Sequence, residues 1–424
     1  MILSELFHYN FKKCIEIKYI NGIIIVYSVR LSLNETEFIM NILIFTASTG
    51  GGHKRAAAAL ETKIHILDSS CEVNVVDALK QIGKLYDKTV CGGYHFMATK
   101  IPKVYGVSYK ITDKKSVIYK AVMDSNKVVA KKLLAVIEEY NPDVIIACHP
   151  FVSSMLSKLK EKGYLGNEKI ISLITDYDSH RTYIGKNIDA FVLAEPQMAK
   201  KLIKSYDVDP QIIHPLGIPI FDSFADTDFD RDEICKREGL DPNKQTVLLM
   251  AGSFGVTSVL DFYKQLALES ENLQFIVITG NNKKLYKHLE ELIDELGTKD
   301  NTKLLFFVDN VYDYMHISDV IVTKPGGLTV TESLACHLPL AIYSAFPGQE
   351  LDNATFLAKQ NAALLLNKKR GAEEVIELLE DKPRLDSMRE TCKRLSIPNS
   401  AENIFRLAQK LVGENKYNKQ IEEN

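Results

Sequence analysis

At 424 residues the chain is long enough for two domains of roughly 150–200 residues each. Its hydrophobic content of 46% and charged content of 25% are typical of globular proteins and exclude the disordered and fibrous classes. The net charge of −3 indicates no particular partner, and no apolar run approaches the roughly 18–20 residues that span a bilayer, so we expect any membrane contact to be peripheral.

The first 39 residues differ from the rest of the chain. Met40 directly precedes Asn41-Ile-Leu-Ile-Phe-Thr46, which predicts the first strand of an α/β domain. Such domains often begin with a strand close to the start codon. We therefore expect residues 1–39 to be an upstream extension that is not part of the native protein. A genuine hairpin or tail is the alternative.

From Asn41 onward, short apolar runs alternate with longer amphipathic stretches, which predicts βαβ units and parallel sheets. The predicted strands of the first half are Ile42–Ala47, Val73–Asp77, Val144–Cys148, Ile170–Thr175 and Ala190–Leu193, with helices such as Lys54–Ile66 and Lys127–Tyr140 between them.

Three glycines follow the first strand, in the run Thr46-Ala-Ser-Thr-Gly-Gly-Gly-His53. Glycines let the backbone approach a ligand, and the free N–H groups at a helix start favour an anion or a developing negative charge. The helix dipole at that position favours a neutral, basic imidazole. Gly51, Gly52 and His53 are therefore candidate site residues. The alternative is a plain tight turn, because the spacing matches neither a dinucleotide fingerprint nor a Walker loop.

Residues 84–132 hold eleven lysines and three aspartates, a charge of +8 in a chain of −3, with aromatic residues interleaved. Each lysine near an anionic leaflet gains roughly 1 kcal/mol, and aromatic side chains suit the interface. We expect Lys103, Lys110, Lys114 and Lys115 to contact an anionic membrane surface. A solvated lysine face and a nucleic-acid site are the alternatives.

Polar side chains also follow later strands of the first half. His149 follows Val144–Cys148, and Asp176 and His180 follow the strand that ends at Thr175. Because ligands of α/β folds bind at the carboxyl ends of strands, these side chains are candidates for one site. Each of them taken singly is equally compatible with an ordinary loop residue.

The second half repeats the alternation after an acidic segment, Asp222–Asp232, that predicts a linker. Its predicted strands are Val247–Ala251, Gln274–Thr279, Leu304–Phe307, Val320–Thr323 and Leu340–Tyr343. The loop Gly252-Ser-Phe-Gly255 follows the first of them and is a candidate phosphate cradle. Each half has a glycine-rich loop after its first strand, and the two loops together are stronger evidence for a ligand site than either loop alone.

The most specific motif is Thr323-Lys-Pro-Gly-Gly-Leu-Thr-Val-Thr-Glu332, followed by Pro347-Gly-Gln-Glu-Leu-Asp-Asn353. The proline and glycines end the strand and expose backbone N–H groups. A carboxylate at Glu332 can accept both hydroxyls of a ribose, and Gln349, Glu350 and Asn353 suit the hydroxyls of a sugar. A helix cap followed by a polar loop is the alternative.

Four motifs of the chain, in this order, resemble the monogalactosyldiacylglycerol synthase and processive diacylglycerol glucosyltransferase family. They are Phe45-Thr-Ala-Ser-Thr-Gly-Gly-Gly-His-Lys-Arg-Ala-Ala57, Ile174-Thr-Asp-Tyr-Asp-Ser-His180, Phe275-Ile-Val-Ile-Thr-Gly-Asn281, and Thr323-Lys-Pro-Gly-Gly327 with Pro347-Gly-Gln-Glu350. The resemblance runs from about Met40 to about Leu411. It implies a GT-B fold, in which two Rossmann-like domains face each other across a cleft, and an inverting transfer of glucose or galactose from a UDP-sugar to 1,2-diacylglycerol.

The resemblance also implies roles for single residues. His53 is the expected base or base-orienting group, with Asp176 as the rival, and Gly51, Gly52, His149 and His180 lie on the acceptor side. We expect the diphosphate of the donor to contact Gly252, Ser253, Phe254 and Gly255, and the uracil to contact Phe307 and Val308. Glu332 is expected to bind the ribose, and Gln349 and Glu350 the transferred sugar. The further expected donor contacts are Lys324, Gly326, Gly327, Leu328, Thr329 and Asn353. One departure is that plant relatives carry tryptophan in the acceptor region, whereas this chain has none.

The expected organisation follows from the strand and linker patterns, and the resemblance adds the roles of the two domains. It comprises the extension (1–39), an N-terminal domain for acceptor and membrane (40–222), a linker (223–243), a C-terminal UDP-sugar domain (244–395), and a C-terminal helix and polar tail (396–424). The helix is expected at roughly Ser400–Gly413, and the tail after it is expected to be disordered. We expect no cofactor and no metal site, because this fold neutralises the diphosphate with helix dipoles and Asp176-Tyr-Asp178 only resembles a D-x-D pair. We expect the UDP-sugar, diacylglycerol and the membrane surface as partners, and no nucleic acid.

Seven cysteines without a C-x-x-C pair fit a reducing cytosol, so we expect the protein at the inner face of the cell membrane. Three other functions stay open: an N-acetylglucosamine transferase acting on the undecaprenyl-linked peptidoglycan precursor, a UDP-sugar epimerase on the same two-domain plan, and a non-catalytic UDP-sugar sensor.

Overall fold

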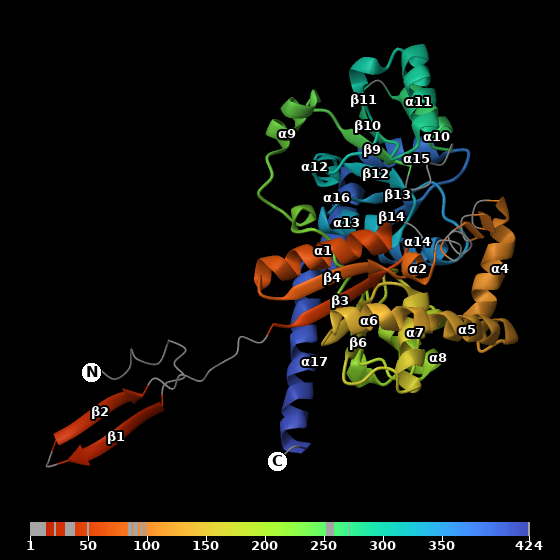
Figure 1. Cartoon of the computed structure of the whole chain (residues 1–424). Coiled ribbons are helices and arrows are strands. Elements are labelled where there is room, and N and C mark those ends of the chain that lie inside the picture. The colour runs from red at the N-terminus through yellow and green to blue at the C-terminus, as the bar shows by residue number, and fades with distance from the viewer. Residues whose placement is uncertain are drawn as a thin grey trace. The chain divides into compact units, whose positions relative to one another are not determined.

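The computed structural model describes residues 14–20, 23–29, 39–48, 51–83, 87, 92–93, 96–97, 100–251, 258–270 and 272–422. The chain divides into two units, Met1–Met40 and Asn41–Asn424. In the first unit, strands β1 (Cys14–Ile20) and β2 (Ile23–Val29) pair antiparallel (Figure 1). The segment predicted to be an extension therefore contains a two-stranded hairpin.

The second unit begins with a six-stranded parallel sheet in the order β4-β3-β5-β6-β7-β8. Its strands are β3 (Asn41–Thr46), β4 (Glu72–Asp77), β5 (Val144–Ala147), β6 (Lys169–Leu173), β7 (Ala190–Val192) and β8 (Ile213–His214). β3 and β5 are buried almost throughout, as expected for strands covered by helices on both faces. The five predicted strands are present, and only the two-residue edge strand β8 was missed.

The helices of this half connect the parallel strands. They are α1 (Gly52–Leu67), α2 (Ala78–Ile82), α4 (Pro102–Thr112), α5 (Val117–Ala130), α6 (Leu134–Tyr140), α7 (Pro150–Glu161) and α8 (Ala199–Tyr206). The helix predicted over Lys127–Tyr140 is wrong as a single element. α5 ends at Ala130, and a 3₁₀ turn at Lys131–Leu133 joins it to α6, because the chain tightens locally where one helix follows another.

A second parallel sheet has the order β11-β10-β9-β12-β13-β14. Its strands are β9 (Thr246–Met250), β10 (Gln274–Ile278), β11 (Thr302–Leu305), β12 (Val320–Thr323), β13 (Leu340–Ile342) and β14 (Ala363–Leu365). This is the 3-2-1-4-5-6 order of doubly wound folds, which bind ligands where the order reverses, here between β9 and β12.

The helices of the second half complete the layers. They are α10 (Ser258–Glu269), α11 (Lys283–Leu296), α12 (Val311–His316), α13 (Gly327–Ala335), α14 (Gln349–Gln360), α15 (Gly371–Glu380) and α16 (Lys382–Leu395). Between the two sheets the chain forms α9 (Arg231–Glu238), whose start is capped by the Asp230 side chain accepting from two backbone N–H groups.

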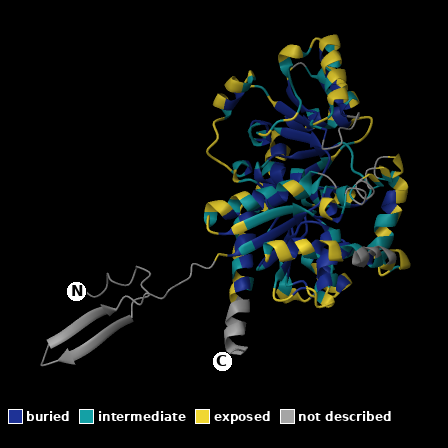
Figure 2. Cartoon of the chain, viewed as in Figure 1, coloured by how far each residue is buried: buried dark blue, intermediate teal, exposed yellow. Residues whose placement is uncertain are grey.

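The hydrophobic core is shared between the halves. One buried cluster extends from the first sheet, for example Leu43 and Phe45, through α13 to Leu248 and Ile276 of the second sheet. A separate cluster fills the other face of the second sheet under α10, α11, α15 and α16. Figure 2 shows these buried residues running through both halves.

The last helix returns to the first half. α17 (Ser400–Glu422) packs against α1 (Figure 1). It extends well beyond Gly413, so the prediction that a disordered tail begins there is wrong. Glu, Lys and Gln in this polar stretch are good helix formers, and a helix that packing has already nucleated is extended at little cost.

Candidate active site

Three neighbouring strands of the first sheet, β3, β5 and β6, end at one edge, and candidate residues follow each of them. His53 lies in the first turn of α1, after β3. His149 follows β5 and caps α7, where its Nδ1 accepts from the Phe151 N–H at 3.2 Å. Thr175 and Asp176 follow β6. The fold thus brings the predicted residues His53, His149 and Asp176 to the carboxyl edge of the first sheet.

His53 is held as a neutral imidazole. Its Nδ1 lies 3.0 Å from Thr175 Oγ1, and its ring meets the His149 ring edge-on, with centroids 4.9 Å apart. Burial lowers the pKa of His53 to about 4, although a hydrogen bond to the Cys148 backbone opposes this. Burial, with the neighbouring His53, also lowers the pKa of His149 well below its usual range. Both rings are therefore uncharged at neutral pH.

The pKa of Asp176 shifts in the opposite direction, because burial favours the uncharged form of a carboxyl as well. Burial raises the pKa of this carboxyl to about 7, although a hydrogen bond from Asn353 opposes the effect, and the nearby carboxylates of Glu350, Asp352 and Asp178 raise it further. The Asn353 Nδ2 donates to Asp176 Oδ1 at 3.1 Å and to the Pro325 carbonyl at 2.9 Å. Asp176 thus titrates near neutral pH, as a general base should.

The two halves meet directly at this edge. A Cβ on Gly327 would lie 1.9 Å from the Thr175 carbonyl oxygen, so no other residue allows the same approach of α13 to β6. The Tyr177 hydroxyl lies 3.0 Å from Thr331 Oγ1, and the Tyr177 N–H donates to Asn353 Oδ1 at 2.7 Å. A Cβ on Gly52 would touch the predicted donor residue Leu328 at 3.4 Å. The predicted donor motif therefore packs against the predicted acceptor edge.

Lys324 is a buried cation of the donor motif. Its side chain is 7% exposed, and its Nζ lies 3.0 Å from the centroid of the Phe346 ring. The Nζ is 3.6 Å from Glu350 Oε2, an ion pair too long for a good hydrogen bond. Burial lowers the pKa of Lys324, and the charge of Glu350 opposes that shift. Glu350 also accepts from the Phe346 N–H at 2.7 Å, which fixes the loop that leads into α14.

Glu332 forms an ion pair across the two halves. Its Oε1 lies 3.1 Å from Arg55 Nη2 of α1, and its side chain is 5% exposed. Burial raises the pKa of Glu332 to about 7, although the charge of Arg55 opposes this. Arg55 was not among the predicted site residues, although it belongs to the motif 45–57, because nothing in the spacing shows that α1 faces α13.

Helix α4, from the basic segment, packs on the loop that precedes α14. The Tyr105 hydroxyl donates to Gln349 Oε1 at 2.6 Å. A Cβ on Gly106 would lie 2.6 Å from Pro347 Cβ, and Gly348, with φ +107°, packs against the rings of Tyr105 and Tyr109. The helix that carries two of the predicted membrane lysines is therefore in direct contact with the predicted sugar-binding residue Gln349, an arrangement that the sequence did not indicate.

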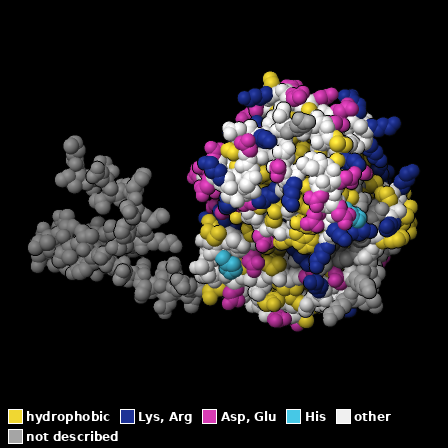
Figure 3. All heavy atoms as spheres, turned by 90° about the horizontal axis from the view of Figure 1, so that it is seen from above, with side chains coloured by type: hydrophobic (Ala, Val, Ile, Leu, Met, Phe, Trp, Pro, Cys, Tyr) yellow, Lys and Arg dark blue, Asp and Glu magenta, His cyan; other side chains and the backbone are white. Residues whose placement is uncertain are grey.

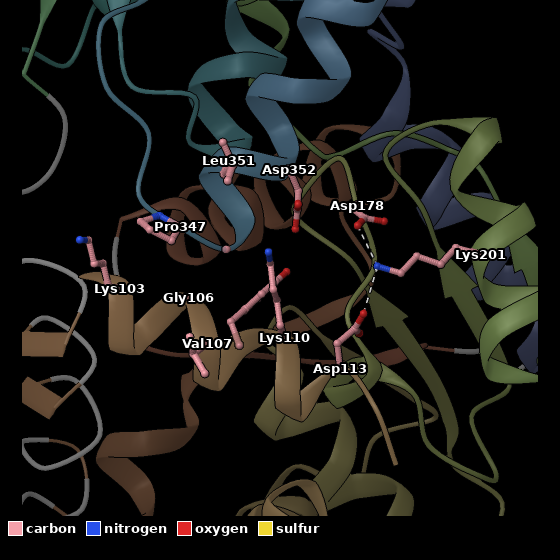
Figure 4. A pocket seen from close by; sticks show the side chains of 12 residues that line it. Lys103, Gly106, Val107, Lys110, Asp113, Asp178, Lys201, Pro347, Leu351 and Asp352 are labelled. Atoms are coloured by element: carbon pink, nitrogen blue, oxygen red, sulfur yellow. Dashed lines mark hydrogen bonds and ion pairs between the residues drawn. The ribbon is translucent and has the colours of Figure 1, made fainter. Parts of the chain in front are cut away.

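A cavity of about 420 Å³ opens between α4, α8 and α14. Figure 4 shows Lys103 and Lys110 of α4 on one side and Leu351 and Asp352 of α14 on the other. Lysine 201 projects in from α8. Of the predicted membrane lysines, two thus line this cavity, and Lys114 and Lys115 are exposed beside α4.

His180 supports α4 and does not join the two other histidines. Its Nε2 lies 3.0 Å from the Tyr109 carbonyl oxygen, its Nδ1 lies 2.7 Å from Thr182 Oγ1, and its ring is 4.3 Å from the Tyr109 ring. Burial lowers its pKa, and the hydrogen bond to Tyr109 opposes this. His180 lies in the first half with both ring nitrogens engaged by the fold, and its acceptor-side role stays a prediction.

The remaining predicted donor residues follow strands β9, β11 and β12 in the sequence. Gly252, Ser253, Phe254 and Gly255 lie outside the described residues. Phe307 (55% exposed) and the partly buried Val308 follow β11. In the other donor loop, a Cβ on Gly326 would meet nothing within 4 Å, and Thr329 of α13 is partly buried.

Two features are absent from the described residues. No described group of three or more His, Cys, Asp or Glu side chains is arranged to hold a metal ion. No helix in the described part of the chain has the length and apolar character needed to cross a membrane. The expected absence of a metal and of a cofactor stays a prediction.

Comparison with known proteins identifies similar sequences and folds. The family described as monogalactosyldiacylglycerol (MGDG) synthase matches residues 53–220, and the family glycosyl transferases group 1 matches residues 230–395. A relative from Bacillus pumilus, the processive diacylglycerol beta-glucosyltransferase, is 31% identical over 86% of this chain and 93% of its own length.

Solved structures share the fold at low sequence identity. The S. aureus MnaA–UDP complex has a TM-score of 0.58 at 14% identity and covers 87% of this chain and 95% of its own. A glycosyltransferase from Rickettsia africae has a TM-score of 0.53 at 13% identity, with 88% and 99% covered. Two six-stranded parallel sheets with this likeness confirm the predicted GT-B fold.

Proposed function

The chain belongs to the family of processive diacylglycerol beta-glucosyltransferases, and we propose that its two halves divide the reaction between acceptor and donor. It is a hexosyltransferase that moves a hexose from a UDP-sugar to diacylglycerol and so makes a membrane glycolipid. In our proposal the second half, from Lys324 to Asn353, binds the UDP-sugar, and His53 and Asp176 of the first half act on the lipid hydroxyl.

The observation that carries this division is the contact at Gly327. The glycine lets the donor motif approach the Thr175 carbonyl, one residue from Asp176, at a distance that no side chain permits. A base and a donor sugar held on opposite halves come within reach of one another only when the halves are this close. Such closure also excludes water, which would otherwise compete with the lipid hydroxyl.

The proposed reaction is a single displacement. The diacylglycerol hydroxyl oxygen forms a bond to the anomeric carbon, the bond from that carbon to the β-phosphate oxygen breaks, and UDP leaves with the electron pair. The hydroxyl proton passes to the base. Because the sugar of a UDP-hexose is α-linked, one displacement gives the β-glycoside that the relative's name describes.

We assign the base to Asp176 and an orienting role to His53. A pKa of about 7 leaves Asp176 able to take a proton at neutral pH and to release it again, whereas the low pKa of His53 makes that imidazole a weaker base. The contact between His53 and Thr175, 3.0 Å, suits a neutral group that orients the hydroxyl. Lys324 and the Gly252–Gly255 loop would stabilise the charge that develops on UDP.

We propose that α4 and the start of α5 rest on the inner face of the cell membrane. Exposed apolar residues, Val104 (55%), Val107 (58%), Val117 (86%) and Ile118 (48%), alternate there with exposed lysines. Figure 3 shows hydrophobic and basic side chains side by side along the right edge of the molecule, the side on which α4 lies in Figure 1. Apolar side chains insert at the headgroup level while lysines attract anionic lipid.

Vesicle pelleting tests the membrane surface. The triple variant Lys110→Glu, Lys114→Glu, Lys115→Glu should lose salt-sensitive binding to vesicles that contain phosphatidylglycerol. A control with Lys287→Glu, on an exposed helix of the second half, keeps the same binding. Equal pelleting of the triple variant and the control would remove this face from the proposal.

The function itself is tested with purified protein and vesicles that contain diacylglycerol. UDP-glucose and UDP-galactose are offered separately, and the lipid products are identified by mass spectrometry. We expect hexosyl-diacylglycerol from UDP-glucose, in line with the relative's name. Intact UDP binding without product from either donor would contradict the proposal and point to an undecaprenyl-linked acceptor or to a sensor.

A further inference from the structure

We propose that Arg55, in helix α1 of the first half, is a positioning residue for the ribose of the donor nucleotide and acts through Glu332. The inference rests on the proposed function, in which the second half binds the UDP-sugar. It deepens that function, because it gives the first half a part in recognising the nucleotide. The single displacement proposed for this chain assigns Arg55 no role.

Glu332 lies at the place where a doubly wound fold binds its ligand. Helix α13 starts at the carboxyl end of β12, beside the point between β9 and β12 where the strand order reverses. Glu332 follows in the second turn of this helix, and its side chain is 5% exposed. A carboxylate at this position can reach the hydroxyls of a ribose, provided that it is ionised and correctly oriented.

Arg55 supplies the contact that orients this carboxylate. Its Nη2 lies 3.1 Å from Glu332 Oε1, and no other described residue forms a hydrogen bond or ion pair with the Glu332 side chain. The guanidinium carbon lies 5.8 Å from the centroid of the buried Phe224 ring, within the range of a cation–π contact. Arg55 is therefore held between two groups, and its planar guanidinium fixes the direction of the carboxylate.

The carboxylate of Glu332 can bind a ribose while it stays paired with Arg55. An ionised carboxylate has about four lone-pair positions, so contact with one guanidinium leaves acceptors for the 2′ and 3′ hydroxyls. Hydrogen bonds to an ionised acceptor are the strong ones. Burial raises the pKa of Glu332 and so favours the protonated form, and the charge of Arg55 opposes that shift. Arg55 thus preserves the acceptor that the ribose hydroxyls need.

The burial of Glu332 also decides between positioning and competition. In a competitive arrangement the ribose would displace the guanidinium from the carboxylate. A ribose carries no charge, so its entry in place of Arg55 would leave a buried carboxylate without a counter-charge, which is strongly unfavourable. The ribose therefore joins the ion pair and does not replace it.

The test is calorimetric binding of UDP and of 2′-deoxy-UDP to the full chain. Wild type should bind UDP at least about tenfold tighter, because 2′-deoxy-UDP lacks one hydrogen bond to a charged acceptor. Arg55→Met should lower this affinity ratio at least about fivefold, mainly by weakening the binding of UDP. Arg55→Lys, which keeps the charge without the planar fork, should restore part of the ratio.

A double-mutant cycle shows whether Arg55 acts through Glu332. Glu332→Gln should lower the ratio by itself, and adding Arg55→Met to it should change the ratio by less than about twofold. If the two substitutions instead lower the ratio independently, Arg55 does not position Glu332 and the inference fails. The cycle also covers the case in which Arg55→Met fails to fold, because Arg55→Lys can take its place.

Lys54→Met is the matched control. Lys54 precedes Arg55 in α1, is 44% exposed against 37% for Arg55, and pairs with Asp77 of its own half at 3.3 Å. Its loss should leave the ratio as in wild type. Equal weakening of both ligands in Arg55→Met, an unchanged ratio, tighter binding of UDP, or a wild type without discrimination would each overturn the inference. Failure of the proposed function is distinct, because the wild type would then discriminate between the nucleotides and make no lipid product.

Discussion

The carboxyl edges of the two sheets meet, and they differ in the ion pairs that their buried groups form. On the first sheet, burial favours the uncharged forms: His53 and His149 are neutral, and Asp176 holds its proton up to a pH of about 7. On the second sheet, burial acts in the same direction on Lys324 and Glu332, but each of them faces an opposite charge, Glu350 and Arg55 respectively. A carboxyl that titrates near neutrality beside neutral imidazoles suits proton transfer, whereas ion-paired side chains suit the binding of a charged nucleotide.

Removing the carboxylate of the first edge should have the largest effect. Asp176→Asn should lower kcat by about 10²–10⁴-fold, the usual contribution of a general base, and leave the Kd for UDP nearly unchanged. His53→Ala should also reduce kcat strongly, by about 10²-fold, because an orienting contact is lost. Steady-state kinetics and calorimetric UDP titration measure both. Full activity of either variant would remove that residue from the chemistry, and weakened UDP binding would show that the two edges do not divide the work.

Separating the edges should have the next largest effect. Gly327→Ala places a Cβ 1.9 Å from the Thr175 carbonyl oxygen, so the halves must move apart. We expect kcat to fall about 10²-fold through misplacement of the donor and the radius of gyration from small-angle scattering to rise. Gly326→Ala is the structural control, because its Cβ meets nothing within 4 Å and the radius should stay the same. An unchanged radius in Gly327→Ala would contradict the close approach.

The pH dependence of kcat separates the two candidate bases. The base acts when deprotonated, so with Asp176 as the base kcat should rise as pH increases and level off above about 7. With His53 as the base the rise would be centred near 4, and the profile would be flat between pH 6 and 8. Measurement of kcat over that interval with diacylglycerol vesicles distinguishes them. A flat profile would return the role of base to His53.

The smallest expected effect is on the free energy of unfolding and involves Glu332 of the second sheet. The folded pKa of Glu332, about 7, is above its unfolded value, so its protonation stabilises the fold at low pH, and this contribution is lost as pH rises from about 4.5 through 7. Glu332→Gln removes that dependence. The free energy of unfolding of the wild type, relative to the variant, should fall by about 1–3 kcal/mol between pH 4.5 and 8. Urea unfolding measures it, and a constant difference would show that Arg55 fully compensates the buried charge.

Much of the fold could be predicted from the sequence because its inner strands are continuous buried runs. For β3 and β12, for example, the sequence indicated both that a strand forms and where it lies. The edge strands β8 and β14 have two and three residues, too few to show a period, and were missed. The extension of α17 was missed because its polar residues resemble a tail, although their helix propensity is good.

Individual residues of the candidate site could be predicted from the sequence, but the contacts between them could not. His53, Asp176 and Glu332 were identified from motifs and strand ends. Their partners come from the other half of the chain, as Arg55 does for Glu332 and Asn353 for Asp176, and no spacing shows which helices face each other. The pKa values of these carboxyls follow from burial at that contact, so they also depended on the structure.

The return of α17 to the first half determines how the halves are able to move. The chain passes between them twice, once on the way to β9 and once before α17, and the passages touch, since a Cβ on Gly217 would lie 2.9 Å from Ile397. Two domains that are connected by one flexible segment can rotate in any direction. Two adjacent connections restrict their relative motion to a hinge rotation at that place. In Figure 1, α9, which belongs to the first passage, and α17, which follows the second, lie on the side away from α4. Any opening is therefore smallest at these connections and largest at α4, so in our proposal a lipid product leaves along that helix.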